Sequence, residues 1–475
     1  ALYLVGSRVR PQVLQPSLRK APNLMLTERL AEFVADQSLD DIPDEVYDAA
    51  RDAVIDTLGV AFAGSGEPVA DIAASWVAET GAPSRATIWG RGLGGSAADA
   101  AFANGISAHA LDFDDSHPGG RGHISACLVP TVLTMGEVLG SSGREVLAAY
   151  AIGLELASVV GRAFGPGHQR HGWHPTATVG TIAATTAAAR LSGLDAEGVA
   201  RAWGIAGSEV SGLARNFGTM TKPFHIGRAA QTGVTAAGLA EKGLTADGTI
   251  FDDAGSVIDV YAGGDGEPIE YVVASLCHPW AVVSPGNCVK QWPCCYSGHR
   301  TIATLVDLRG QHEINADNVT EVSIAFLPGG DASLLSTDPQ TGLEGKFSIE
   351  YIVAALLLEG TLKMATFTDA MVQRPEARKL MQRVRRIYIP DENFYSGIAG
   401  YNDITVTTKN DQFEVREDRV PGSRVWPMSA QERDAKFTDC VTPILGRSKT
   451  AALLEQIKHI HSINDIGTLL KITPK

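Results

Sequence analysis

The sequence feature that most restricts the fold is an alanine- and threonine-rich segment at residues 176–191, TATVGTIAATTAAARL. Almost every side chain in it is small, and Gly193 follows at a position where helices commonly end. A helix that is apolar on most sides has to be buried among other elements. Residues 43–63, 144–163 and 228–242 carry similar apolar helical patterns. The first half of the chain is therefore expected to form a large helical core.

The pattern changes after the loop-like segment GGDGEP at residues 263–268. The later part contains segments rich in β-branched and aromatic residues, which predict strands. These segments are Val319–Leu327, Val384–Ile389, Ile404–Thr408 and Phe413–Arg416. The last two are joined near Asn410 and Asp411, which predicts a hairpin turn.

The simplest architecture is mainly α, with a large all-helical domain interrupted by a smaller α+β lid domain. Within the smaller domain, helices are expected at Phe347–Leu358 and from Asp369, and helical patterning returns near Ser429. The predicted ranges are an N-terminal extension at 1–26, the helical domain at 27–286 and 421–475, and the lid domain at 287–420.

Composition argues against several classes of function. A net charge of -14 over 475 residues does not suit a nucleic-acid partner, which needs clustered lysine and arginine. No apolar run reaches the roughly 18–20 residues that span a bilayer, so no membrane segment is expected. Six cysteines without a C-x-x-C pair predict neither a disulfide framework nor an iron–sulfur site, and they favour a reducing, cytoplasmic compartment. The mitochondrial matrix is the alternative, because residues 1–26 contain basic but no acidic residues.

The densest polar cluster is HALDFDDSHPGGRGH, residues 109–123. Three interpretations are open: a solvated loop with helix-capping aspartates, a divalent-metal site, or acid–base chemistry in which a carboxylate orients an imidazole. The metal interpretation describes a hydrolase built on Asp112, Asp114, His117 and His123. Against it, the cluster lacks the H-x-x-x-H or H-E-x-x-H pairing of helical metal sites.

Four further polar clusters open or precede apolar helical patterns. They are QRHGWHP at 169–175, TKPFHIGRAA at 221–230, KQWPCCYSGHR at 290–300 and KFSIEYIVAALLLEG at 346–360. A non-catalytic helical scaffold predicts that all five clusters lie apart as caps and surface charges, whereas an enzyme predicts that they converge on one cleft. A G-x-G-x-x-G match over Gly90, Gly92 and Gly95 lacks a βαβ context, so no dinucleotide site is expected.

Taken in order, six segments resemble the MmgE/PrpD family, which includes 2-methylcitrate dehydratase, cis-aconitate decarboxylase and iminodisuccinate epimerase. The segments are NGISAHALDFDDSH, GWHPTATVGTIAAT, TKPFHIGRAAQTGV, KQWPCCYSGHR, GKFSIEYIVAALLLEG and PMSAQERDAKF. The resemblance implies a homodimer whose active site lies between a helical domain and a lid. It also implies a small anionic carboxylate as the substrate and no metal or other cofactor.

Carried over by motif, the resemblance also implies roles for individual residues. The implied catalytic residues are His123, His174, Asp112, Lys222 and Tyr351, and the implied substrate-binding residues are Ser116, Lys290 and Lys222. In this scheme a histidine is the general acid or base, Asp112 orients it, and the lysines stabilise charge on carboxylate oxygens. Ser116 stands where the decarboxylases typically have threonine, and the loop from Ser116 to His123 is one residue longer. Dehydration, decarboxylation and epimerisation of a dicarboxylate such as iminodisuccinate therefore stay open.

Overall fold

The computed structural model describes residues 25–395 and 399–471. The predicted N-terminal extension, residues 1–26, lies almost wholly outside the described residues. Leu26 already begins helix α1 (Leu26–Asp36), and its backbone N–H donates a 2.7 Å hydrogen bond to the Asp252 carboxylate.

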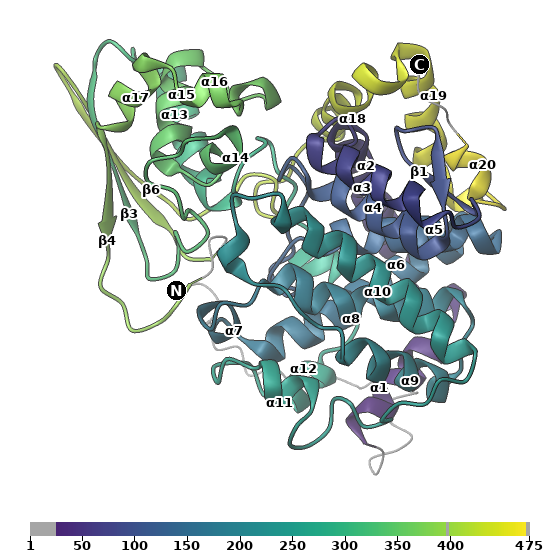
Figure 1. Ribbon diagram of the computed structural model, residues 1–475. Coiled ribbons are helices and arrows are strands. Elements are labelled where there is room, and N and C mark those ends of the chain that lie inside the picture. The colour runs from purple at the N-terminus through teal and green to yellow at the C-terminus, as the bar shows by residue number, and fades with distance from the viewer. Residues whose placement is uncertain (1–24, 396–398, 472–475) are drawn as a thin grey trace.

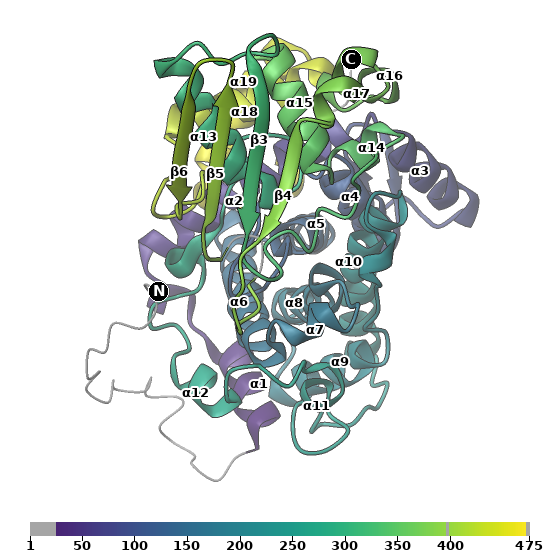
Figure 2. The same ribbon diagram turned by 90° about the vertical axis from the view of Figure 1, so that its left-hand side faces the viewer.

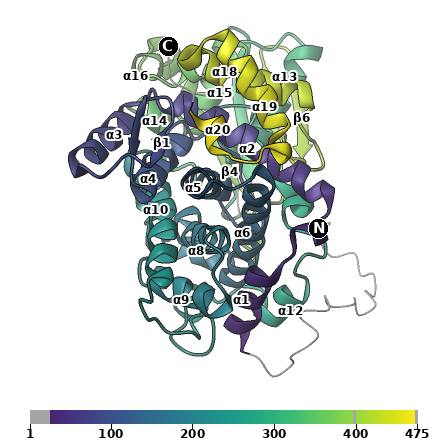
Figure 3. The same ribbon diagram turned by 90° about the vertical axis from the view of Figure 1, so that its right-hand side faces the viewer.

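Most of the chain forms a body of packed helices, seen at the right of Figure 1 and from its other side in Figure 3. After α1, its helices are α2 (Asp44–Gly64), α3 (Pro68–Thr80), α4 (Ala97–His109), α5 (Ile124–Leu139), α6 (Gly143–Phe164), α7 (Gly167–Arg170), α8 (Pro175–Leu191), α9 (Ala196–Gly207), α10 (Thr221–Glu241), α11 (Val257–Tyr261), α12 (Ile269–Ala274), α18 (Ala430–Leu445), α19 (Arg447–Lys458) and α20 (Gly467–Leu470). Helix α18 packs against α2, so segments from both ends of the sequence build this body.

Helix α8 lies inside this body, as the alanine-rich pattern predicts. It packs against α5, α6, α9 and α10. Small residues allow the helices to approach closely: a Cβ added at Gly233 of α10 would lie 2.7 Å from the Ala184 Cβ of α8. The helices predicted at 43–63 and 144–163 are confirmed as α2 and α6.

Helix α10 begins at Thr221, seven residues before the apolar pattern at 228–242, so the TKPFHIGRAA cluster at 221–230 opens this helix, as the sequence indicated. The sequence around Pro223 resembles a helix break, but proline is tolerated in a first turn, where its missing N–H has no partner within the helix. The consequence is functional, because Lys222 and His225 stand on the first turns of a rigid helix.

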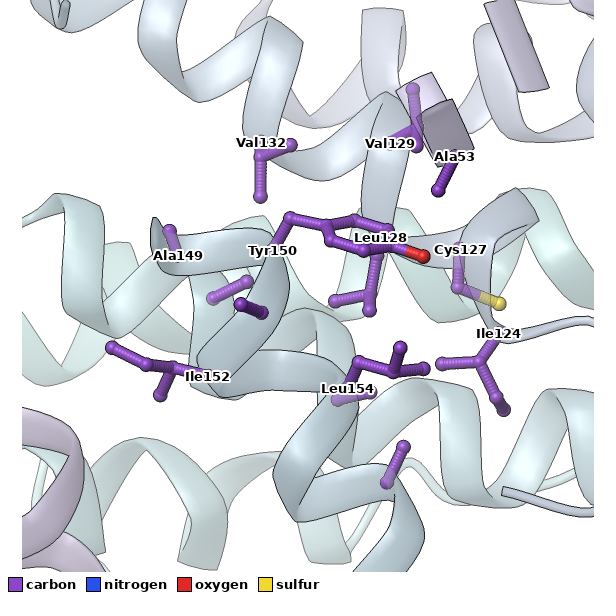
Figure 4. Close-up of a cluster of buried hydrophobic side chains, with 14 of the residues drawn as sticks. Ala53, Ile124, Cys127, Leu128, Val129, Val132, Ala149, Tyr150, Ile152 and Leu154 are labelled. Carbon is purple, nitrogen blue, oxygen red and sulfur yellow. The ribbon is translucent and has the colours of Figure 1, made fainter. Parts of the chain in front are cut away.

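Helix α6 is long and apolar enough to cross a membrane by length and composition, and 94% of its apolar window is buried inside the protein. Figure 4 shows Tyr150 of this helix among Leu128, Val129 and Val132 of α5. The Tyr150 hydroxyl hydrogen-bonds with Ser125 at 2.7 Å. The core therefore reaches the first turn of α5, next to the polar 109–123 segment.

A second, smaller part contains a four-stranded sheet of order β4-β3-β5-β6, seen face-on in Figure 2. Its elements are α13 (His299–Gln311), β3 (Val319–Phe326), α14 (Gly342–Gly345), α15 (Ile349–Glu359), α16 (Asp369–Val372), α17 (Pro375–Met381), β4 (Val384–Tyr388), β5 (Asn402–Thr408) and β6 (Gln412–Glu417). Strands β3 and β4 are parallel, and the other two pairs are antiparallel. All four predicted strands and the β5–β6 hairpin are confirmed.

Helices α13 and α15 pack on the sheet and close a hydrophobic core separate from that of the helical body. A mainly α protein with a small sheet is therefore confirmed, while a lid that moves stays a prediction. The glycine-rich segment forms an antiparallel hairpin of β1 (Ala86–Ile88) and β2 (Leu93–Gly95). This antiparallel pair is not the strand–turn–helix context that a dinucleotide site requires.

Candidate active site

The polar segment between α4 and α5 is buried, although its composition resembles that of a surface loop. Asp112 is 4% exposed, and Asp114, Asp115 and His117 are 0% exposed. Buried charged groups are tolerated only when they are paired or hydrogen-bonded. The interpretation of this segment as a solvated loop was therefore wrong.

Asp112 shares its carboxylate between two lysines. Lys222 Nζ lies 2.5 Å from Asp112 Oδ1, and Lys290 Nζ lies 3.0 Å from Oδ2. Burial raises the pKa of Asp112, but the two ammonium groups outweigh burial and hold that pKa well below its usual range. The Asp112 carboxylate therefore holds two ammonium groups at one place in the protein.

The backbone around Asp112 is held by lysines from three separate parts of the chain. Asp112 has a φ of 51°, in the left-handed region that costs energy for a residue with a side chain. The consecutive carbonyls of residues 111–113 each accept a hydrogen bond, from Lys346 to Leu111, from Lys290 to Asp112 at 2.7 Å, and from Lys436 to Phe113 at 2.8 Å. Lys290 lies just before the smaller part that contains the sheet, and Lys346 belongs to that part. The hydrogen bonds to residues 111–113 therefore connect the two parts of the protein.

His109, the last residue of α4, connects Asp114 to Lys222. Its Nδ1 lies 2.8 Å from Asp114 Oδ2, and its Nε2 lies 2.6 Å from Lys222 Nζ. Burial and the charge of Lys222 hold the pKa of His109 well below its usual value. A neutral His109 that donates from Nδ1 to Asp114 presents the lone pair of Nε2 to the Lys222 ammonium.

His123 is the residue immediately before α5 and has a defined tautomer. Its Nδ1 lies 2.6 Å from the Asp115 carbonyl, which can only accept, so Nδ1 carries the proton and Nε2 is left as the basic atom. Burial and Lys290 hold the pKa of His123 well below its usual value. The carboxylate nearest His123 is Asp114 at 3.5 Å. Asp112 contacts the two lysines most closely and lies 3.9 Å from His109, from Oδ1 to Nε2, so its role in orienting a catalytic histidine stays a prediction.

His174 precedes α8 and faces a second histidine. Its Nδ1 lies 3.1 Å from His225 Nδ1, so one of the two nitrogens donates and the other accepts. Burial, Lys222 and His225 all hold the pKa of His174 well below its usual value. Burial and Lys222 lower the pKa of His225 to about 4. Both imidazoles are therefore neutral near pH 7. One of the two rings carries its proton on Nδ1 and donates it to Nδ1 of the other ring.

All five polar clusters of the sequence contribute to the wall of one cavity. In chain order, the contributions include Asp112, His123, His174, Lys222, Cys295 and Phe347. The scaffold hypothesis predicted separate clusters, and this convergence contradicts it. Because the first three segments belong to the helical body and the last two border the part with the sheet, the cavity lies where the two parts meet.

The remaining predicted site residues have different positions. Ser116 lines the cavity, and its backbone pairs with Cys288. Lys290 is fully buried behind Asp112 and is not among the residues of the cavity wall. Tyr351 is also absent from the wall, because its hydroxyl donates a 2.6 Å hydrogen bond to the Thr366 carbonyl. A direct contact of Lys290 or Tyr351 with a ligand therefore finds no support in this geometry.

The four residues of the metal hypothesis do not assemble into a ligand set. His117 Nε2 donates to the Ala281 carbonyl at 3.0 Å, and its Nδ1 accepts from the Gly120 N–H at 2.9 Å, so neither nitrogen is free. A different trio, His109, Asp112 and His123, has ligand atoms within 4.8 Å of one another. Lys222 Nζ lies 2.6 Å from His109 Nε2 and 2.5 Å from Asp112 Oδ1, where a cation held by this trio would sit.

Sequence reasoning did not assign His109, His225 or Lys346 to the site. For two of them, the spacing in the sequence pointed to the site. His225 lies three residues after Lys222 on one helix, and His109 lies three residues before Asp112. Residues three apart on a helix share a face, so His225 follows Lys222 into the cavity region. The role of Lys346 depends on packing between the two parts and carries no local signal.

The fold and the site define a mainly helical protein with a buried lysine–aspartate–histidine cluster that suits chemistry on an anionic substrate. The chain belongs to the MmgE/PrpD family: the N-terminal domain of the family matches residues 28–269, and its C-terminal domain matches residues 292–461. It is 26% identical to the cis-aconitate decarboxylase of Homo sapiens over 461 residues, covering 94% of each chain. The cis-aconitate decarboxylases of Mus musculus and Aspergillus terreus are also 26% identical, over 466 and 476 residues, covering 94% of this chain and 93% and 95% of theirs. The family resemblance inferred from the motifs is confirmed, and these relatives are lyases.

Proposed function

We propose that this protein is a lyase that decarboxylates a small tricarboxylate through a carbanion next to a second carboxylate. The observation that carries the proposal is the pair of ammonium groups, Lys222 and Lys290, held at Asp112 beside His123 and His174 at one cavity. The relatives named cis-aconitate decarboxylase support decarboxylation over the other reactions of the family.

In the proposed reaction, the bond between the leaving carboxylate carbon and the neighbouring carbon breaks. Carbon dioxide departs, and the electron pair stays on the substrate. A conjugated double bond spreads this charge onto the oxygens of a second carboxylate. Lys222 on the cavity wall stabilises these oxygens, and Lys290 supports the arrangement from behind Asp112. A proton delivered to the carbanion completes the reaction.

His123 is the proposed proton donor. Its pKa is held well below the usual value in the free site, by burial and by Lys290, so the free imidazole is neutral. A substrate carboxylate placed beside the ring raises its pKa, because an opposite charge favours the protonated form. The histidine therefore takes up a proton together with the anionic substrate and passes it to the carbanion from Nε2.

Proton NMR in deuterated water tests the proposal, with chelator-treated protein and four separate compounds: cis-aconitate, 2-methylcitrate, citrate and iminodisuccinate. Decarboxylation predicts loss of carbon dioxide from cis-aconitate and one deuterium in the product. Loss of water from 2-methylcitrate or citrate identifies a dehydratase instead. Deuterium entry with epimerisation of iminodisuccinate identifies an isomerase. No change in any compound contradicts the proposed function.

A further inference from the structure

The loop between Ser116 and His123 brings an arginine, Arg121, to the cavity wall. Its backbone φ is 56°, so it adopts the left-handed conformation that side chains disfavour. Among the described residues, four non-glycine residues have such a positive φ, and two of them, Asp112 and Arg121, line this cavity. Backbone strain of this kind concentrates at functional sites.

The loop is fixed against helix α6. The Arg121 N–H bonds the Pro118 carbonyl at 3.3 Å, and its Nε donates to the Gly161 carbonyl at 2.8 Å. A Cβ added at Gly161 would lie 2.4 Å from the Gly119 carbonyl oxygen, so only glycine permits this approach. The position of the guanidinium is therefore set by the fold before any ligand binds.

The charge of Arg121 has no paired carboxylate in the part of the chain that the structure describes. The nearby acidic residues already serve other arginines: Glu267 pairs with Arg162 at 2.6 Å, and Asp265 pairs with Arg170 at 2.6 Å. Burial lowers the pKa of Arg121, and these two carboxylates offset only part of that effect. A partly buried cation without a partner at a cavity wall is suited to an anionic ligand.

We propose that Lys222 binds a terminal carboxylate of the substrate and Arg121 binds the central one, so that the site prefers a tricarboxylate to the dicarboxylate that lacks it. This inference rests on the proposed function, since it assigns a residue to a further carboxylate of that substrate. The planar guanidinium can donate two parallel hydrogen bonds to a carboxylate, which a lysine cannot reproduce.

Calorimetry with two unreactive probes tests the inference independently of turnover. The probes are propane-1,2,3-tricarboxylate and pentanedioate, which lacks the central carboxylate. The wild-type protein should bind the tricarboxylate more tightly. Arg121→Gln should weaken tricarboxylate binding on the order of tenfold or more, by loss of charged hydrogen bonds, and leave pentanedioate binding nearly unchanged. Arg121→Lys should restore only part of the difference.

Arg416→Gln is the control, because Arg416 pairs with Asp403 on the sheet and neither residue is on the cavity wall. It should keep the preference of the wild-type protein. Equal affinity of the wild-type protein for both probes, or an unchanged preference in folded Arg121→Gln and Arg121→Lys, would overturn the inference. Those results leave decarboxylation in the NMR assay intact, whereas failure of the proposed function appears there as no conversion.

Discussion

Lys222 Nζ lies 2.5 Å from Asp112 Oδ1, across 110 residues of sequence. This contact joins the first turn of α10 to the strained backbone after α4. It also places an ammonium group on the cavity wall with a carboxylate on one side and His109 on the other. A cation held in this way costs little reorganisation when negative charge develops beside it.

Lys222→Ala is expected to lower kcat/KM for the decarboxylated substrate by at least about a hundredfold, because the developing charge loses its main stabilising group. The NMR assay with varied substrate concentration measures this ratio. Lys242→Ala is the control, since Lys242 follows the same helix and is exposed. Wild-type activity in a folded Lys222→Ala variant contradicts the assignment.

The substitution His123→Asn distinguishes the role of ring nitrogen Nδ1 from that of Nε2. The amide of asparagine can still donate to the Asp115 carbonyl in place of Nδ1, but nothing replaces Nε2. The expected loss in kcat is about a hundredfold or more, because a positioned acid–base group contributes at least that much. Circular dichroism checks folding. If the variant turns over at the wild-type rate, proton transfer does not pass through His123.

The fold was largely predictable because its elements have strong local periodicity. Alternating β-branched residues marked β3 and β5, and an apolar alanine-rich helix had to be α8. Local pattern was less informative at Pro223, because proline is compatible both with a break and with the first turn of a helix. The apolar pattern at 228–242 therefore did not by itself show that α10 begins at Thr221.

The site was predictable in part, for a related reason. The sequence motifs predicted Asp112, Lys222 and His123 as site residues, and the structure places all three on the wall of one cavity. The motifs also predicted Tyr351, whose hydroxyl instead donates a hydrogen bond to the Thr366 carbonyl. This contact depends on packing, which a local sequence pattern does not show. The contact of His109 with Lys222 spans 113 residues of sequence, so it becomes visible only when α4 and α10 are packed together.

Acid is expected to destabilise the protein as the pH falls from about 6.5 to about 4. Burial lowers the pKa of His117, His168 and His225 to about 4 in the folded protein, whereas the unfolded chain protonates near the ordinary value of about 6.5. The unfolded state then binds more protons over this window, so the free energy of unfolding decreases as the pH is lowered.

A buried carboxyl acts in the opposite sense. Burial raises the pKa of Glu155 to about 7, which favours the folded state as the pH falls from about 7 toward 4.5, the ordinary value for the unfolded chain. Burial also raises the pKa of Asp56, Asp114 and Asp115. These four carboxyls oppose seven histidines whose pKa is lowered: His109, His117, His123, His168, His174, His225 and His299. Thermal melting at constant ionic strength should therefore give a lower Tm at pH 5 than at pH 7, and an equal or higher Tm at pH 5 would contradict this account.

Tyr150→Phe tests the connection between the core and the site. The hydroxyl bonds Ser125 Oγ at 2.7 Å and Asn287 Nδ2 at 2.8 Å, and Ser125 also donates to Asp115 at 2.6 Å. Removing it takes away two buried hydrogen bonds, while Asn287 Nδ2 and Ser125 Oγ keep their own contact at 3.3 Å, so the expected cost is about 1–3 kcal/mol of unfolding free energy. Urea denaturation measures the change. Tyr271→Phe, at an exposed tyrosine, should have almost no effect.

Asp114→Asn tests whether His109 positions Lys222. The carboxylate of Asp114 requires a proton on His109 Nδ1, which turns the lone pair of Nε2 toward the ammonium of Lys222. The asparagine amide can instead donate to His109 Nδ1. The ring proton then lies on Nε2, where it faces the ammonium group of Lys222 and repels it. The misplaced ammonium is expected to lower kcat on the order of a hundredfold.

The pH profile separates this role of Asp114 from a merely structural one. If Asp114 acts through the tautomer of His109, the pH dependence of kcat should shift in Asp114→Asn while the melting temperature stays close to that of the wild-type protein. His109→Gln removes the ring and should reproduce the loss of activity. A variant with lower activity, an unchanged pH profile and a lower melting temperature would show that Asp114 only supports the fold of the 109–123 segment.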